Sequence, residues 1–247
     1  MSRLKGSPTS YFSRLVSTAC SLTFLFILNA VLLVTLSILQ FIGAMGDITW
    51  WSDAYAIASN ILISCFVSFI FYFLLVHVPE SRRSEMLKKN ALSVYRSVKK
   101  DILFNVLSAS IKGGRKDIEL TYELIDKLMK PENFRHKFED GREADEGFYA
   151  FENQMSHETY EFVEITHQLG ILSRHLNFLM HNFPFKGGEL FQYITRLENL
   201  LLRIQASGAG YDESKPLCRF VFQIYAGWDW VSGYIGYDRI EKALKEL

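Results

Sequence analysis

Two long apolar runs near the start of the chain dominate its pattern of hydrophobic and polar positions. Neither the run from Leu15 to Gly46 nor the run from Ala54 to Val78 contains an Asp, Glu, Lys or Arg. About 20 apolar residues in a helix cross the hydrocarbon core of a bilayer, so each run is long enough to span it. Lipid offers the backbone no hydrogen-bond partner, which requires each span to be helical. The pattern predicts a two-helix transmembrane hairpin at residues 15–78, with spans at about 15–43 and 55–78.

Basic residues are distributed unevenly around these runs. Three stand before the first run, none lies in the loop of residues 44–53, and seven lie between Arg82 and Lys100. Because cytoplasmic segments next to membrane spans are enriched in Lys and Arg, this distribution predicts a two-pass protein with both termini in the cytoplasm. We expect residues 1–14 to be a basic cytoplasmic N-terminus. Residues 79–100 are expected to be a basic juxtamembrane neck that the anionic inner leaflet of the bilayer attracts.

Polar side chains recur at helical spacing inside the apolar runs. Asn60, Ser64 and Ser68 stand four residues apart and share one face of the second span, and Asn29 is a polar position of the first. One interpretation is close helix–helix contact. The other is a polar stripe that lines a pore built by several copies, since one hairpin has too few helices to enclose a channel. No Asp, Glu, Lys or Arg lies within the spans, which argues against a proton relay.

The pattern changes after the neck to that of a cytoplasmic all-α domain at residues 101–247. Helical periodicity and helix-breaking residues predict a bundle large enough to hold its own core, and no segment alternates convincingly as a strand. The segment 130–143 is predicted to be a charged loop. The predicted helices cover residues 80–111, 115–130, 143–182, 187–207 and 215–246.

The last predicted helix is dense in aromatic residues and contains Gly227, Gly233 and Gly236. One interpretation is a bundle core that packs closely at the glycines. The other is a surface for an oligomer or a soluble partner, because aromatic residues are enriched at such surfaces.

Charge and cysteine content exclude several classes of function. The whole chain has no net charge, but from residue 101 onward it has 17 basic and 23 acidic residues. A domain with this acidic balance is not expected to bind nucleic acid sequence-specifically. The three cysteines show neither a CxxC nor a Cys/His spacing, so we expect no metal site, no disulfide framework and no cofactor.

The strongest candidate ligand site lies in the segment 160–182. His167, Arg174 and His181 are spaced by seven residues and share a helical stripe, with Glu164 one turn before the first of them. Cations along a largely apolar helix need acidic partners, solvent or a ligand. An anionic ligand such as a nucleotide phosphate would suit Arg174 between two histidines. The alternative is a solvated face, or one paired with acids of a neighbouring helix.

Two short motifs in the same segment resemble those of enzymes. Arg174 and His181 have the R-x6-H spacing that resembles the signature of HEPN ribonucleases, which implies a charge clamp and a general acid/base paired across a dimer. The residue after Arg174 is His175 rather than the commoner Asn. Glu164 and His167 match one E-x-x-H unit of di-iron bundles, but a second unit is missing. With no nucleotide-binding or hydrolase motif, we expect no enzymatic activity, and a HEPN-like ribonuclease at the membrane is an alternative.

The layout of the whole chain resembles that of two-transmembrane effectors of bacterial anti-phage defence systems, including retrons and cyclic-nucleotide systems. The resemblance implies an effector of the inner membrane, held inactive alone or by a regulatory protein or nucleoprotein complex. Its triggering would rearrange a homo-oligomer and disrupt or depolarise the lipid bilayer. A membrane-tethered scaffold or sensor that recruits a soluble partner is the alternative from a different class.

Overall fold

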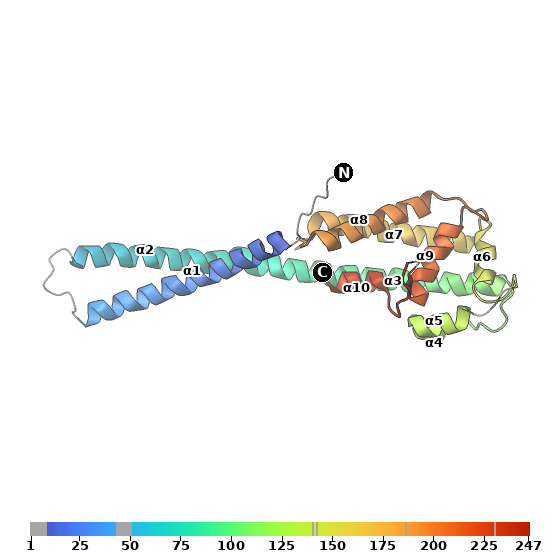
Figure 1. Ribbon diagram of the computed structural model, residues 1–247, viewed down its shortest axis with the longest axis horizontal. Coiled ribbons are helices and arrows are strands. Elements are labelled where there is room, and N and C mark those ends of the chain that lie inside the picture. The colour runs from blue at the N-terminus through green and yellow to red at the C-terminus, as the bar shows by residue number, and fades with distance from the viewer. Residues whose placement is uncertain (1–8, 43–50, 140, 142, 186, 230) are drawn as a thin grey trace. The chain divides into compact units, whose positions relative to one another are not determined.

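The computed structural model is mostly helical, with 77% helix and 2% strand, as Figure 1 shows. The all-α prediction is confirmed at this level. The structure describes residues 9–42, 51–139, 141, 143–185, 187–229 and 231–247, with side chains from residue 24 in the first range and from residue 52 in the second. Most of the predicted basic N-terminus and of the loop at 44–53 lies outside the described residues.

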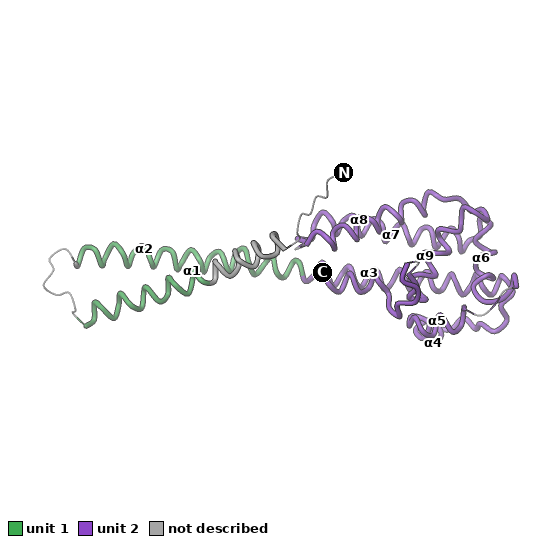
Figure 2. The backbone as a smooth tube through the Cα atoms, viewed as in Figure 1, with its two compact units in different colours: residues 1–84 green, residues 85–247 purple. Residues whose placement is uncertain are grey.

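Two compact units divide the chain, residues 1–84 and residues 85–247 (Figure 2). Each has its own internal contacts. Residues 85–100, which the sequence assigns to the neck, therefore belong to the second unit.

Unit 1 contains the two apolar helices, α1 (Thr9–Phe41) and α2 (Trp51–Tyr72). They lie side by side and run in opposite directions (Figure 1). Phe26 of α1 stacks on Phe66 of α2 with ring centroids 5.1 Å apart, and its edge meets Phe69 at 5.8 Å. Both helices are long and apolar enough to cross a membrane.

A π-helical turn, η1 (Phe73–His77), joins α2 to α3 (Val78–Lys112) without a break in the helix. Its backbone N–H at Val78 bonds to the oxygen of Phe73, five residues earlier. Pro79 accounts for the wide turn, because a proline lacks the N–H group and its ring collides with the carbonyl four residues before it, at Leu75. The helix therefore continues through a proline that would otherwise kink or end it.

Unit 2 is built on α3, which has the most buried residues of any helix described. Among the helices that follow, α7 and α8 pack along one another, and α9 contacts α5 and α6. β1 and β2 form an antiparallel pair in which Trp228 faces Tyr234. The elements after α3 are α4 (Tyr122–Leu128), α5 (Pro131–Phe138), α6 (Tyr149–Met155), α7 (Tyr160–Asn182), α8 (Gly188–Ala206), α9 (Lys215–Ala226), β1 (Trp228–Asp229), β2 (Gly233–Tyr234) and α10 (Arg239–Lys245).

The predicted charged loop at 130–143 was wrong for most of its length, because it contains α5. Pro131 occupies the first turn of this helix, where its missing N–H has no cost. Phe134 and Phe138, one turn apart, are fully buried and stack with ring centroids 4.5 Å apart. Phe134 also stacks on Tyr225 of α9 at 5.2 Å. Two apolar positions among charged ones therefore suffice to place this helix on the core.

The single helix predicted at 215–246 was also wrong. It ends at Gly227, whose φ of 60° is left-handed, and the chain then forms the β1–β2 pair before α10. Gly233 and Gly236 have φ of 74° and 76°. The glycines therefore end the helix and turn the chain instead of packing within a helix. The core interpretation of the aromatic segment is confirmed for α9, where Phe220 and Tyr225 are buried.

Two further predicted helices are shorter than expected. Residues 115–121 precede α4, whose first turn is capped by the Thr121 hydroxyl accepting from the N–H of Leu124. The predicted helix 143–182 is split into α6 and α7 by residues 156–159, and the Thr159 hydroxyl caps α7 by accepting from Phe162. Side-chain oxygens of this kind satisfy the first N–H groups of a helix and so set its start.

Arg115 holds together the segments before α4 and after α5 by hydrogen bonds. The guanidinium of Arg115, 9% exposed, donates two hydrogen bonds of 2.7 Å to the carboxylate of Asp117. It also donates to the backbone oxygens of Gly147, at 2.7 Å, and Lys137, at 3.1 Å. The hydrogen bonds from Arg115 to the Asp117 carboxylate, together with the ammonium group of Lys137, hold the pKa of Asp117 far below its usual range.

Gly227→Ala should lower the free energy of unfolding by about 1–2 kcal/mol, since a left-handed backbone strains any residue with a Cβ. The added atom would also lie 3.0 Å from the backbone nitrogen of Tyr237. Gly233→Ala should cost about 1 kcal/mol from strain alone, because nothing lies within 4 Å of its new Cβ. Unfolding of the purified full chain measures both.

The matched control for these glycine variants is Gly188→Ala. This glycine begins α8, has no left-handed φ and has open space around it. Its substitution should leave the free energy of unfolding unchanged or slightly higher, because alanine favours a helix. Equal unfolding of the Gly227 and Gly188 variants would contradict the assigned role of Gly227.

Candidate functional site

The residues predicted to bind a ligand lie together on α7. They line neither the groove on α1 nor the cavity between α8 and α9. His167, Arg174 and His181 are exposed, and Glu164 is half-buried. Glu164 accepts a hydrogen bond of 3.0 Å from the side chain of Gln168, and Nδ1 of His181 lies 2.8 Å from the backbone oxygen of its own helix at Asn177. The structure therefore brings Arg174 and the two histidines to one exposed helix face. An ion pair for any of them is absent among the residues with described side chains.

The two residues of the R-x6-H motif are exposed. Arg174 and His181 stand on the same face of α7, and neither forms an ion pair with a side chain that the structure describes. No cluster of three or more His, Cys, Asp or Glu side chains able to hold a metal occurs in the part of the chain that the structure describes. A HEPN-like site would need a second copy of the chain to complete it.

The polar residues of unit 1 separate into two places. Asn29 is 9% exposed and is the one buried side chain among residues 24–42 and 52–84. Its side-chain oxygen has no hydrogen-bond partner among the described residues. Asn60, Ser64 and Ser68 are exposed, and they lie on the side of α2 opposite to its contacts with α1. Asn29 and the α2 stripe therefore do not form one continuous surface.

The α2 stripe, defined as Asn60, Ser64 and Ser68, contains one unsatisfied group. The hydroxyl of Ser64 donates to the backbone oxygen of Asn60 at 2.7 Å, and that of Ser68 donates to the oxygen of Ser64 at 2.8 Å. No hydrogen bond is found for the Asn60 amide among the described side chains. An amide on an apolar helix favours contact with another helix.

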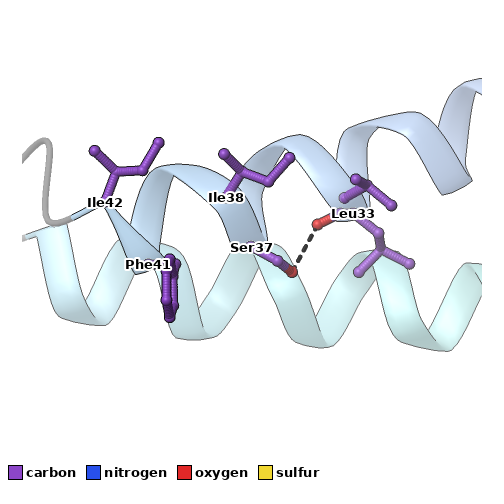
Figure 3. Close-up of a pocket in the computed structure, with 6 residues that line it drawn as sticks. Leu33, Ser37, Ile38, Phe41 and Ile42 are labelled. Atoms are coloured by element: carbon purple, nitrogen blue, oxygen red, sulfur yellow. Dashed lines mark hydrogen bonds between the residues drawn. The ribbon is translucent and has the colours of Figure 1, made fainter.

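A surface groove of about 460 Å³ lies on α1 (Figure 3). It is lined by five residues of this helix and by Ile42, which follows it, and the single hydroxyl among them, that of Ser37, donates to the backbone oxygen of Leu33 at 2.8 Å. The groove thus offers apolar side chains and no free polar group. Its chemistry suits contact with acyl chains better than binding of a polar ligand.

A buried ion pair in unit 2 was not anticipated from the sequence. Lys99 was assigned to the basic neck, but its side chain is 2% exposed. Its ammonium group lies 2.7 Å from Oδ2 of Asp238, which is 5% exposed. The hydroxyl of Tyr95 donates to the same oxygen, and the hydroxyl of Tyr225 donates to the backbone oxygen of Lys99. Lys99 therefore holds α3 to the C-terminal segment and cannot contribute to an exposed basic surface.

Asp238 also begins α10. Its Oδ1 accepts from the N–H groups of Ile240 at 2.9 Å and Glu241 at 3.2 Å. Glu241 in turn pairs with Arg96 at 2.7 Å, one helical turn before Lys99 on α3. Asp238 and Glu241, one turn apart at the start of α10, thus form ion pairs with Lys99 and Arg96, one turn apart on α3.

Burial of this cluster affects its tyrosines. Desolvation, and then the negative charge of Asp238, raise the pKa of Tyr95 well above its usual value. The same two causes raise the pKa of Tyr193 on α8 to about 12. Both hydroxyls keep their protons at neutral pH, and that of Tyr95 donates to Asp238.

Sequence patterns hint at only half of this cluster. Asp238 and Glu241 have the D-x-x-E spacing of a helix start. Nothing in the run of seven basic residues distinguishes Lys99 from Lys100, which is exposed and pairs with Asp126 at 2.6 Å. Only the spacing of the buried positions Ala91, Tyr95 and Val98 shows which face of α3 packs against the rest of unit 2.

No protein-family model matches the chain, and neither curated proteins nor solved structures gave a match. The function is therefore inferred from the physical properties of the chain itself.

Lys99→Met should lower the free energy of unfolding by about 3–5 kcal/mol, because it leaves the carboxylate of Asp238 buried without its cation. Lys100→Met is the matched control and should cost no more than about 1 kcal/mol, the value of an exposed pair. Adding Asp238→Asn to Lys99→Met should restore part of the loss, since Asn removes the charge and still caps a helix. Equal unfolding of the two single variants would contradict the assignment.

Proposed function

We propose that the protein is an effector of the bacterial inner membrane that crosses the bilayer twice and disrupts or depolarises it when triggered. In this proposal α1 and α2 are the spans, and unit 2 is a cytoplasmic helical domain that controls how copies associate. The bilayer and further copies of the chain are its partners.

The observation that carries the proposal is the exposure of the apolar helices. In the 18-residue apolar windows of the two candidate spans, 6% and 0% of the residues are buried. Large side chains such as Phe41, Phe71 and Leu75 are exposed. Removing a side chain of this size from water contributes about 1.5–3 kcal/mol, so a surface of this kind favours lipid over water.

Charge supports the proposed orientation. Arg82 and Arg83 are exposed directly after the apolar segment, where a membrane surface would meet them, whereas Lys99 is buried. Each such cation near an anionic leaflet contributes about 1 kcal/mol. The loop of residues 44–53 contains two acids and no base, which favours the outer side for it.

The α2 stripe supports assembly in the membrane. Polar residues on the outer face of a helix in lipid favour a second helix that can hydrogen-bond with them. We infer that Asn60 pairs with another copy of α2, and that several copies gather around the stripe. Such an assembly would place amides and hydroxyls at its centre, where they lower the barrier for water and ions.

Among the alternatives, a scaffold that recruits a partner through the aromatic terminal segment has less support, because Phe220 and Tyr225 are used in the core of unit 2. The effector proposal also agrees with the resemblance of the layout to anti-phage effectors.

Labelling of single cysteines tests the orientation. With Cys20, Cys65 and Cys218 replaced by Ala, a cysteine in place of Lys100 should react with a membrane-impermeant maleimide only after the inner membrane is opened. A cysteine in place of Asp53 should react in intact spheroplasts and serves as the control. Labelling of both positions from outside, or release of the intact chain by alkaline carbonate, would contradict the two-span topology.

The variant Asn60→Leu with Ser64→Leu should abolish depolarisation of induced cells, because it removes the polar groups while leaving the helix apolar. A potential-sensitive dye measures the effect, and membrane fractionation checks that insertion is unchanged. The matched control is Ile57→Leu with Ile61→Leu, at exposed positions of the same helix, which should keep full activity. Full depolarisation by the first variant would remove the stripe from the mechanism.

A further inference from the structure

A second cavity, of about 250 Å³, lies within unit 2 between α8, α9, the β1 strand and the start of α10. Its walls combine apolar residues, among them Leu197, Phe220 and Ile224, with a few polar side chains. Concave apolar surfaces with a small number of placed polar groups are typical of sites for small molecules. None of the residues proposed above to act in the membrane contributes to it.

The two carboxylates in the wall already have partners. Asp238 accepts from Tyr95 and Lys99 with one oxygen and from α10 with the other. Asp229 accepts from the N–H groups of Val231 at 2.9 Å and Ser232 at 2.8 Å, and its other oxygen pairs with Arg239. These acids therefore add no uncompensated negative charge and offer little acceptor capacity to a ligand.

Two donors that α8 contributes to the wall have no partner among the side chains that the structure describes. Arg196, exposed at the edge of the cavity, forms no ion pair or hydrogen bond with any side chain that the structure describes. Tyr193, one turn earlier on the same face of α8, is half-buried, and its hydroxyl likewise has no described hydrogen-bond partner. Since the pKa of Tyr193 is raised to about 12 by burial and by Asp238, its hydroxyl is a donor at neutral pH.

The α8 side of the cavity thus carries one positive charge without a described partner and one neutral donor, three residues apart, beside apolar walls. A guanidinium and a hydroxyl that line the same cavity suit the two oxygens of a carboxylate or a similar anion. The volume lies just below the range of about 300–1,000 Å³ typical of sites for drug-sized ligands. The complementary molecule is therefore a small organic acid with one negative charge and an apolar body the size of a single ring.

We propose that this cavity is a binding site for a small organic monoanion, whose charged group is held by Arg196 and Tyr193 and whose apolar body packs against the walls formed by α8 and α9. Asp238, which pairs with Lys99 of α3, is part of the same wall. The site is independent of the proposed action in the membrane.

Benzoate is the probe, because it combines one ring with one carboxylate. Binding to the purified full chain in detergent is measured by ligand-observed NMR and by thermal unfolding. The weakest dissociation constant expected for a ligand of nine non-hydrogen atoms is on the order of 10 mM. Benzoate should bind saturably in this range and raise the unfolding temperature. Acetate, which has the charge without the ring, and benzyl alcohol, which has the ring without the charge, should each bind at least about tenfold more weakly.

Arg196→Gln should weaken benzoate binding at least about tenfold, and Tyr193→Phe should weaken it by a smaller factor. Arg196→Lys should keep part of the affinity, because it retains the charge without the planar fork. The matched control is Arg203→Gln, an exposed arginine of α8 outside the cavity, which should bind as the wild type does. Equal affinity of the Arg196 and Arg203 variants, or no saturable binding up to about five times the expected constant, would overturn the proposal.

Discussion

The carboxylate of Asp238 accepts four hydrogen bonds, and the arrangement of unit 2 depends on them. Two come from side chains of α3, Tyr95 and Lys99, and two from the first backbone N–H groups of α10. A buried ammonium and a buried carboxylate are each unfavourable alone, and they become tolerable only when they meet with good geometry. The segments around residues 99 and 238 must therefore pack together in the folded unit. All the helices and strands between these two segments in the chain must therefore fold so that residues 99 and 238 can meet.

Helix α3 contributes to two very different surroundings. Its first residues follow an apolar helix with almost no buried side chains, while the part from Ala91 onward lies in the core of unit 2. The π turn before Pro79 lets one helix continue through both. In the proposed effector, this continuity gives the cytoplasmic unit a direct covalent and helical link to the span α2.

The sequence predicted what depends on long patterns. The two apolar helices, the helical character of the remainder and the ends of α3 and α8 follow from periodicity and from glycines at helix boundaries. The predicted secondary structure was wrong where one or two residues determine the local fold against the average composition of the segment. In α5, Phe134 and Phe138 bury themselves although charged residues surround them, and in the last segment Gly227 takes a left-handed conformation that no periodicity reveals. The candidate residues of α7 were placed correctly on one stripe, but the pair of Lys99 and Asp238, 139 residues apart, could not be read from local pattern.

The burial of Arg115 affects how readily trypsin can cleave the chain. The connections that its guanidinium joins are short, charged and rich in lysine and arginine, which is the composition that trypsin prefers. Yet the side chain that the enzyme would have to grip is inside the fold, and its donors are engaged with Asp117 and with two backbone oxygens. The bond after Arg115 should therefore resist trypsin for as long as the guanidinium stays in place, whereas the exposed Lys116 beside it has no such protection. Cleavage after Arg115 would report the opening of unit 2 rather than the accessibility of a loop.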